Sequence, residues 1–318
     1  MRKLMLIQVT LIASCLVLFT AVTSLGQDIN SGAGTSGFSF LKINVGGRAV
    51  AMGGAYTGLA DDEAALYYNP AGIATIEDPR FIAEYHNYFV GLQSGFAGYI
   101  KPLGLDRTVA IHITYLNYGE FTQTDQSGNI EGTFGGGDIM LAGTYAMRRS
   151  QQFMLGVTAK LIYESIQDYS AAALAFDLGL RYTSNRGRHA VGLQLQNLGA
   201  QLSSLGESEK DGLPTVFRLG ASSRPRGLNS VVVADIILPM DNDVQLAVGA
   251  EYFEFKPLYL RMGWNSIGSN LRSEYSDNGL TGLTFGMGLD YKSMQFSYAY
   301  SPAADLGDSH RVTITGSI

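Results

Sequence analysis

The stretch GGRAVAMGGAYTGLADDEAALYYNPAG, residues 46–72, differs in character from everything around it. It begins with small residues and glycine, becomes acidic and then aromatic, and stops at a proline. Asp61 is the expected N-cap of a helix, with Asp62 and Glu63 in a first turn where the helix dipole favours negative charge. Because Pro70 disfavours helical geometry at the residue before it, the predicted helix is short, about two turns.

Four of the six glycines in this stretch permit close backbone packing and positive φ angles. They occur as two pairs, Gly46-Gly47 and Gly53-Gly54, on either side of the alanines that follow Arg48. A compact, kinked plug padded with glycine is therefore the predicted local structure.

These residues also resemble a known family. The small residues around Arg48, followed by ADDEAALYYNPAG at Ala60–Gly72, resemble the start of the PorV/PorQ family, within the larger FadL-like group of outer-membrane β-barrels. The N-P-A triplet is that group's marker in the N-terminal segment that folds inside the barrel. The resemblance implies an outer-membrane location and a lumenal plug, and it assigns to the plug motif Arg48, Gly53, Gly54, Asp61, Asp62, Asn69, Pro70 and Ala71.

The composition is that of a β-rich chain. The 318 residues include 39 glycines, 18 tyrosines and 15 phenylalanines, and the mean hydropathy is only +0.07. Such a mean argues against a polytopic helical membrane protein, which needs several long apolar runs. A net charge of −6 with a pI near 5.2 gives no basic footprint for nucleic acid, so no nucleic-acid partner is expected.

The N-terminus is typical of an export signal. Arg2 and Lys3 precede an apolar run over 4–22, and Ser24-Leu25-Gly26 places small residues before a cleavage site. An uncleaved membrane anchor and lipidation at Cys15 are the two alternatives. The apolar run continues beyond Cys15, which a lipoprotein would not normally show, so the ordinary signal is preferred. We predict a signal peptide over 1–26, a plug segment with the N-P-A motif over 27–79 and a barrel over 80–318.

From Arg80 to the C-terminus the apolar residues alternate with a period of two. Segments such as 153–161, 174–182 and 283–289 alternate clearly, whereas 230–238 is ambiguous because three valines in a row blur its phase. About fourteen strands of roughly ten residues each result, and an even number is what a closed bacterial barrel requires. The predicted fold class is all-β: a transmembrane antiparallel β-barrel of about fourteen strands, with an N-terminal plug containing a short helix in its lumen.

The connections between these strands alternate between short turns and longer loops, as an up-and-down barrel requires. Gly119–Gly137, Gly199–Pro214 and Asn265–Gly279 are predicted to be long loops. With the plug entering from the periplasm, these loops fall outside the cell. Basic residues gather in the short turns, and acidic residues gather in the long loops, notably over 207–211. We interpret both as solvated charge, with an acidic outer face for a partner or divalent cations as the alternative.

The strand phase also predicts which charged side chains point into the lumen. Their signs are mixed, which favours paired charges around a plug over a selectivity path of one sign. The alternative is that some of them line a route for a small apolar or amphipathic ligand. Arg48 is the plug residue expected to pair with a wall carboxylate. The predicted lumen-facing residues are Glu84, His86, His112, Lys160, Asp177, Arg181, Arg218, Glu251, Arg261 and Asp290.

No catalytic, metal or cofactor motif occurs in the chain. The four histidines form no HExxH pattern, and no GxSxG elbow or Walker loop is present. The only cysteine lies in the predicted signal peptide, which excludes disulfides and Cys-based metal sites from the mature chain. We therefore expect no enzyme activity, no metal and no cofactor.

Three functions are compatible with these residues. The PorV/PorQ resemblance implies an accessory or docking component of type IX protein secretion or related export, whose partners are secretion-machinery subunits or exported proteins. The architecture favours a FadL-like transporter whose ligand is a hydrophobic small molecule. A structural barrel without transport is the third. All three place the chain in the bacterial outer membrane, with outer-membrane lipid around it.

Overall fold

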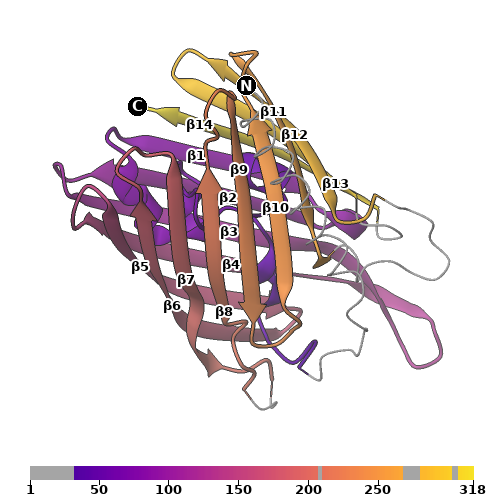
Figure 1. The fold of residues 1–318 in the computed structure, drawn as a ribbon. Coiled ribbons are helices and arrows are strands. Elements are labelled where there is room, and N and C mark those ends of the chain that lie inside the picture. The colour runs from indigo at the N-terminus through magenta and orange to yellow at the C-terminus, as the bar shows by residue number, and fades with distance from the viewer. Residues whose placement is uncertain (1–31, 207–209, 268–279, 303–306) are drawn as a thin grey trace.

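Figure 1 shows the computed structural model of the chain, which describes residues 32–206, 210–267, 280–302 and 307–318. The predicted signal peptide over 1–26 lies outside the described residues. The same is true of Glu207 and Glu209 in the predicted acidic cluster and of most of the predicted loop Asn265–Gly279.

Within the described ranges, fourteen strands form a closed barrel in which every neighbouring pair is antiparallel. The ring closes because β1 pairs with β14 on one side and with β2 on the other. The predicted closed barrel of about fourteen strands is therefore confirmed. The strands are β1 (Arg80–Asn87), β2 (Gln93–Pro102), β3 (Arg107–Thr124), β4 (Ile130–Arg148), β5 (Phe153–Ile166), β6 (Tyr169–Thr183), β7 (His189–Ser203), β8 (Val216–Ser223), β9 (Ser230–Pro239), β10 (Gln245–Tyr252), β11 (Leu258–Asn265), β12 (Leu283–Tyr291), β13 (Met294–Pro302) and β14 (Asp308–Ser317).

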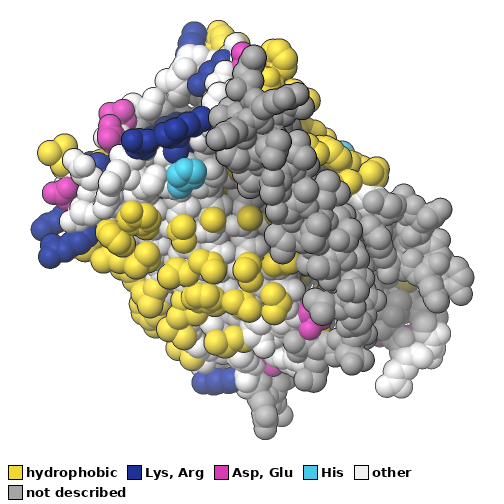
Figure 2. Space-filling model, in the orientation of Figure 1, with side chains coloured by type: hydrophobic (Ala, Val, Ile, Leu, Met, Phe, Trp, Pro, Cys, Tyr) yellow, Lys and Arg dark blue, Asp and Glu magenta, His cyan; other side chains and the backbone are white. Residues whose placement is uncertain are grey.

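The period of two in the sequence becomes an inside and an outside of the barrel. Along β5, Thr158, Lys160 and Ile162 are buried. The alternate residues Leu161 and Tyr163 are 59% and 46% exposed. Successive side chains of a strand point to opposite faces of its sheet. Hydrophobic side chains consequently cover the outer face of the barrel as a broad band (Figure 2). A closed ring of strands with an apolar outer surface spans a membrane, since no backbone edge is left unpaired in the hydrocarbon.

The two ends of the barrel differ. Short connections such as 103–106, 149–152 and 292–293 lie at one end, together with the start of β1 and the end of β14; we call this the turn end. The other end, the loop end, carries the longer connection 204–215. The predicted alternation of short turns and longer loops is wrong for other connections at this end, because β5 and β6 are joined by 167–168 alone and β9 and β10 by 240–244.

The prediction of a long loop over Gly119–Gly137 is wrong. After a register shift between Asn117 and Glu120, β3 and β4 continue as a paired hairpin to a tip at 125–129. The rings of Phe121 and Phe134 pack across it at 5.4 Å between centroids. Aromatic pairs of this kind stabilise neighbouring strands, and the glycines that suggested a loop are accommodated in the ladder. Likewise, β7 extends to Ser203, into the predicted loop Gly199–Pro214.

Four short helical turns precede β1: η1 (Ser39–Lys42), α2 (Gly47–Ala51), α3 (Ala65–Tyr68) and η2 (Pro70–Thr75); a further turn, η3 (Phe89–Gly91), connects β1 to β2. Of the first four, α2 contacts β11 to β14, whereas η2 contacts β3 to β6 on the opposite side of the ring. Residues 38–76, which we call the inner segment, therefore lie within the barrel (Figure 1). In the described part of the chain, no helix has the length and apolarity needed to cross a membrane.

The predicted N-cap at Asp61 is wrong. Helix α3 begins four residues later, its N-cap is Ala64 without a capping side chain, and it makes little more than one turn. Instead, Asp62 accepts a hydrogen bond from the Ala64 N–H at 2.9 Å, while Asp61 is bound by two arginines. The predicted end of the helix is confirmed, because Asn69 before Pro70 is extended, with φ of −169°.

The inner segment runs through the barrel from one end to the other. Ser36 forms a β-bridge with Gly212 at the loop end, and the segment leaves at the turn end, where Arg80 starts β1. Within the described residues the chain therefore runs through the lumen from the loop end to the turn end.

Apolar side chains of the inner segment form the core. Near the middle of the barrel Tyr56, Leu59, Leu66, Tyr68 and Ile73 are completely buried. A second cluster at the loop end joins three residues of the inner segment to wall residues of β3 to β6; its largest members are Phe38, Phe40, Leu41, Leu116, Met140 and Ile162. These two clusters fill the middle and the loop end of the lumen with packed side chains.

The outward face predicts how the barrel responds to charge. Leu161→Arg places a cation near the middle of the apolar band and should lower the free energy of unfolding in lipid by about 2–4 kcal/mol. Leu105→Arg, in the exposed turn 103–106, should leave it unchanged. Urea titrations of the two variants in lipid vesicles measure the difference, and equal stabilities would contradict the assignment of β5 to a membrane-spanning position.

Candidate lumenal site

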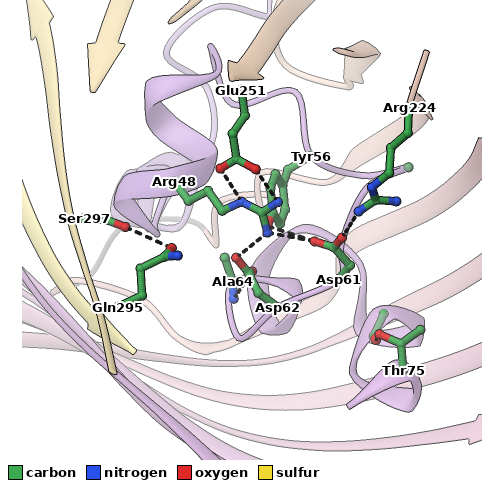
Figure 3. Close-up of polar contacts among 12 residues, drawn as sticks. Arg48, Tyr56, Asp61, Asp62, Ala64, Thr75, Arg224, Glu251, Gln295 and Ser297 are labelled. Carbon is green, nitrogen blue, oxygen red and sulfur yellow. Dashed lines mark hydrogen bonds and ion pairs between the residues drawn. The ribbon is translucent and has the colours of Figure 1, made fainter. Parts of the chain in front are cut away.

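Arg48 of α2 lies at the centre of a buried polar network (Figure 3). Its Nε and Nη2 donate to the two carboxylate oxygens of Glu251 on β10, at 2.9 and 2.8 Å. Its Nη1 donates to Asp61 at 2.8 Å, to the Tyr56 hydroxyl at 2.9 Å and to Asp62 at 3.1 Å. The predicted pairing of Arg48 with a wall carboxylate is confirmed. Bidentate guanidinium–carboxylate pairs are strong and directional, so Arg48 fixes both the position and the orientation of α2 against the wall.

Two wall arginines complete this network. Arg261 on β11 donates to Glu251 at 2.7 Å, so that one carboxylate binds two guanidinium groups. Arg224 donates to Asp61 at 2.6 Å from the turn between β8 and β9. Opposite charges therefore alternate across the lumen, and each buried ion has a partner, which is the condition for burying charge without a large free-energy cost.

The surroundings shift the pKa values of the inner segment's charged groups. Burial alone would lower the pKa of Arg48, but Glu251 and the neighbouring acidic groups hold it well above its usual value. Burial would likewise raise the pKa of Asp61, but Arg48 and Arg224 hold it below its ordinary value. Both groups are therefore charged at neutral pH.

Backbone groups of the inner segment are also bound by wall side chains. The N–H groups of Tyr56 and Thr57 both donate to Asp235 on β9, at 3.0 and 2.9 Å. Arg181 on β6 donates to the Gly58 carbonyl at 3.2 Å, and Gln194 on β7 donates to the Tyr67 carbonyl at 2.8 Å. An irregular chain inside a barrel has no ladder of its own, so the wall supplies the partners that its backbone requires.

The α2 end of the segment is held in the same way. The Gly46 N–H donates to Glu84 on β1 at 2.7 Å, and the Gly47 N–H donates to Thr313 on β14 at 2.8 Å. The Thr284 hydroxyl on β12 donates to the Ala51 carbonyl at 3.1 Å. Contacts of this kind come from strands on both sides of the closure between β1 and β14, so the inner segment ties the two ends of the sheet together.

The triplet Asn69-Pro70-Ala71 lies on a patch of wall glycines. The Asn69 amide donates to the carbonyls of Thr57 and Leu180 at 3.0 and 3.1 Å, and its side-chain oxygen accepts from the Ala71 N–H at 3.2 Å. A Cβ added at the glycines facing the triplet would lie only 2.0–2.3 Å from atoms of the inner segment; these glycines are Gly156, Gly179 and Gly192, on β5, β6 and β7. Only glycine allows such a close approach of two backbones.

Nine of the ten wall residues predicted to face the lumen have side chains buried in the described structure: Glu84, His86, His112, Lys160, Asp177, Arg181, Arg218, Glu251 and Arg261. Asp290 is half-buried and accepts hydrogen bonds from Tyr259 and Gln295 on the wall, both at 2.6 Å. Arg218 lies over the rings of Tyr67 and Tyr68, with centroid distances of 5.9 and 5.6 Å.

Two further groups of these residues are polar clusters in the wall itself. Lys160 lies 2.7 Å from Asp177 and donates to Asn197 at 2.8 Å, with all three residues almost fully buried. At the closure of the barrel, Arg311 donates to His86 at 2.9 Å and lies 3.5 Å from Glu84, while His86 also contacts Ser309 at 2.6 Å.

A small cavity lies beside the Lys160 cluster, between the inner segment and the wall. The inner segment contributes Phe40, Leu41 and Ile43, and the wall contributes Met140 with the polar groups of His112 and Lys160. Its volume is about 10 Å³. That is room for about one water molecule, so this cavity has no space for a hydrocarbon ligand in this conformation.

A larger hollow of about 380 Å³ reaches the Arg48 network from the turn end. Its lining is polar and includes Asp61, Glu63, Arg80 and Asp290 besides Arg48. Water therefore has access to the underside of the inner segment, whereas the small cavity is enclosed between η1, α3 and strands β3 to β5.

Some residues that hold the inner segment are not among those predicted from the sequence. Asp235 was missed because the phase of 230–238 was ambiguous. Gln194 and the glycine patch carry no charge, so the search for charged lumen-facing residues does not find them. The available signal was glycine at inward-facing strand positions, which marks where another backbone approaches closely.

The described residues contain no group of three or more histidine, cysteine, aspartate or glutamate side chains arranged to hold a metal ion.

Comparison with known proteins gives a likeness of fold. No protein-family model matches the chain, and no curated protein matches its sequence. Among solved structures, the toluene transporter TodX of Pseudomonas putida is 14% identical, with 86% of this chain and 97% of that chain covered and a TM-score of 0.59. The monoaromatic hydrocarbon channel CymD is 11% identical over 86% and 98% of the two chains, with a TM-score of 0.60. A FadL homologue of Pseudomonas aeruginosa is 12% identical over 92% and 99%, with a TM-score of 0.55.

The fold is therefore FadL-like, and the chain is a barrel of the bacterial outer membrane. In such barrels the short turns face the periplasm and the longer loops face the outside of the cell.

Arg48→Met should release the inner segment from the wall. It leaves the Glu251 carboxylate with one cation instead of two and removes the bond to Asp61, a loss of about 3–5 kcal/mol for a broken buried pair. Protease cleavage within residues 46–72 of the folded barrel measures the release. Arg224→Met is the matched control: the Arg224 side chain is 37% exposed, so its loss should cost less than about 1 kcal/mol. Equal cleavage of the two variants would contradict a central role for Arg48.

The lowered pKa of Asp61 predicts a pH dependence. Stabilisation from this carboxylate is fully present above the ordinary aspartate pKa of about 3.9 and is lost as the pH falls through the lower folded-state value. The part of the protease protection of residues 46–72 that depends on Asp61, taken as the difference between wild type and Asp61→Asn, should therefore be constant from about pH 8 to pH 5 and fall below about pH 4. In the Asp61→Asn variant, protection of residues 46–72 should be weaker at neutral pH and should depend less on acid pH. Cleavage by an acid-stable protease measures both effects. If protection falls with pH in the same way in the wild type and the variant, Asp61 is not the responsible group.

Proposed function

We propose that the chain is an outer-membrane channel for hydrophobic or amphipathic small molecules, with the inner segment as its plug. The observation that carries the proposal is the small cavity between the inner segment and the wall. Its apolar side is formed by Phe40, Leu41 and Met140, and Lys160 supplies a cation at its polar side. An apolar lining with a few placed polar groups is typical of a site for small ligands.

The FadL-like fold supports this proposal. TodX is described as a toluene transporter and CymD as a monoaromatic hydrocarbon channel, and both share the barrel architecture with this chain. Fold alone does not determine function, so the ligand class is proposed from the cavity and not from the likeness.

Binding of a ligand requires part of the plug to move, because the cavity holds about one water molecule. The part that borders the cavity, residues 36–43, has fewer polar contacts to the wall than residues 46–72. Lys42 and Ser36 bind Asp241, Gly37 donates to the Gly212 carbonyl at 3.1 Å, the Leu41 carbonyl accepts from the Tyr67 hydroxyl at 3.2 Å, and the Phe38 backbone binds Glu164. Residues 46–72 have many more partners. We therefore assign ligand entry to displacement of residues 36–43 at the loop end, while the rest of the plug stays in place.

The expected result is that the chain increases uptake of labelled toluene, or of a labelled fatty acid, by cells lacking their own hydrophobic-solute channels. A disulfide clamp tests the entry step: a Cβ on Gly37 would lie 3.2 Å from the Asp211 Cβ, close to the distance a disulfide bridges. Oxidised Gly37→Cys/Asp211→Cys should lose the added uptake, and a reductant should restore it.

The control clamp joins two wall strands to each other and forms no cross-link to the plug. Thr144 and Thr158 are register partners on β4 and β5 with their hydroxyl oxygens 2.8 Å apart, and Thr144→Cys/Thr158→Cys should transport normally in both redox states. Uptake no greater than that of cells without the chain would overturn the proposed channel. Uptake that persists in the oxidised Gly37→Cys/Asp211→Cys variant would overturn the entry step.

A docking role in type IX secretion is the second candidate. The resemblance of residues 60–72 to PorV and PorQ favours it, and so does the hairpin of β3 and β4, which projects from the barrel (Figure 1). Its tip exposes Ile130 to 75% and Phe121 to 40%, which offers an apolar surface to a protein. Recovery of secretion-machinery subunits or exported proteins with the natively expressed barrel would favour this role over the channel.

A further inference from the structure

A second hollow lies at the turn end, outside the lumen. It has a volume of about 500 Å³ and is formed where the turn 184–188 meets the turn 224–229. The two turns are joined by the Arg224 N–H, which donates to the Arg188 carbonyl at 2.8 Å. Neither the plug nor the proposed transport route accounts for this hollow.

The lining of this hollow is cationic. Arg186, Arg188, Arg224 and Arg226 all contribute to it, whereas no aspartate or glutamate does. Arg224 pairs with Asp61 in the plug, but Arg186, Arg188 and Arg226 have no carboxylate partner among the described residues. Three guanidinium groups around one hollow form a site for an anion with several oxygens, since the planar guanidinium matches phosphate in a bidentate geometry.

The hollow also borders the apolar outer face of the barrel. His189 and Tyr182 line it from outward-facing strand positions, and the Tyr182 ring packs on Phe153 at 4.9 Å between centroids. Val191, the next outward residue of β7, is 43% exposed. Figure 2 shows Lys and Arg side chains gathered at this end of the barrel, directly beyond the hydrophobic band. A ligand held here has its anionic part among the arginines and its apolar part along the strands.

We propose that this hollow binds an anionic phospholipid of the periplasmic leaflet, with the headgroup phosphate held by Arg186, Arg188 and Arg226 and the acyl chains lying along β6 and β7. The turn end faces the periplasm in this class of barrel, so the site is level with the headgroups of that leaflet. The inference does not depend on the proposed transport function.

Native mass spectrometry of the full chain in a non-ionic detergent tests the site. Phosphatidylglycerol is the probe, and phosphatidylcholine with the same acyl chains is the neutral comparison. Wild-type barrel should retain phosphatidylglycerol in preference to phosphatidylcholine. Arg186→Gln/Arg188→Gln/Arg226→Gln should weaken phosphatidylglycerol binding by roughly tenfold, as expected for the loss of charge-assisted bonds to phosphate.

The matched control removes the same charge from the same end of the barrel. Lys101, Arg107 and Arg149 are exposed near other turns and do not line the hollow. Replacing all three with Gln should leave binding unchanged, and both triple variants should migrate as folded barrels on unheated gels. Equal loss of binding in the two variants, or equal retention of the two lipids by the wild type, would overturn the site. Displacement of phosphatidylglycerol by inorganic phosphate at the same concentration would also overturn it, in favour of a soluble anion.

Discussion

An irregular chain inside a barrel must find partners for its own backbone, and this constraint shapes the lumen. The inner segment has only short helical turns and no strand between residues 46 and 72, so several of its N–H and C=O groups have no backbone partner within the segment. Wall side chains provide them: Asp235 accepts two N–H groups, and Gln194 and Arg181 bind carbonyls. Polar residues at inward positions of many different strands are therefore needed to hold one short segment.

The second requirement is that the backbone of the inner segment lies close to the backbone of the wall. Glycines in the wall strands meet this requirement on two opposite sides of the barrel. Gly156, Gly179 and Gly192 let the Asn69-Pro70 backbone lie directly on the wall, and Gly249 and Gly263 do the same for Met52 and Gly53 on the other side. Glycine weakens a strand, but here each one is covered by the inner segment, whose burial of apolar surface offsets that loss. The Arg48 network then fixes the orientation of the segment by charge.

The division of the inner segment into a firmly held middle and a lightly held loop-end part connects structure to function. Residues 46–72 bind the wall on opposite sides, whereas residues 36–43 close a nearly filled apolar cavity through apolar packing on β3 to β6 and fewer polar contacts. Elements that move for ligand entry are drawn from the regions of lowest local stability. The proposed channel thus combines a stable barrel with a cover that moves for ligand entry, and the basic hollow at the turn end lies apart from both.

The fold was predictable from the sequence because a period of two forces alternate residues to opposite faces, and that pattern persists over most of the chain. It placed Lys160 and Glu251 in the lumen from strand phase alone. Local sequence patterns carry no information about which distant side chains bind each other, however. Asp61 was therefore predicted to cap a helix, whereas in the structure its carboxylate pairs with Arg48. Where phase was ambiguous, as around Asp235, the residue was missed. The contacts that decide the site are long-range, and Tyr56 and Asp235 are 179 positions apart.

The most direct test of a wall-bound plug is hydrogen–deuterium exchange of the wild-type barrel, followed residue by residue within 46–72. If the wall binds this segment as described, the amides of Tyr56 and Thr57, which donate to Asp235, should exchange as slowly as those of the strands, and the amides of 36–43 should exchange faster. Exchange of 46–72 at the rate of exposed loops such as 125–129 would contradict the wall-bound plug, because it would mean that the segment is not held in the lumen.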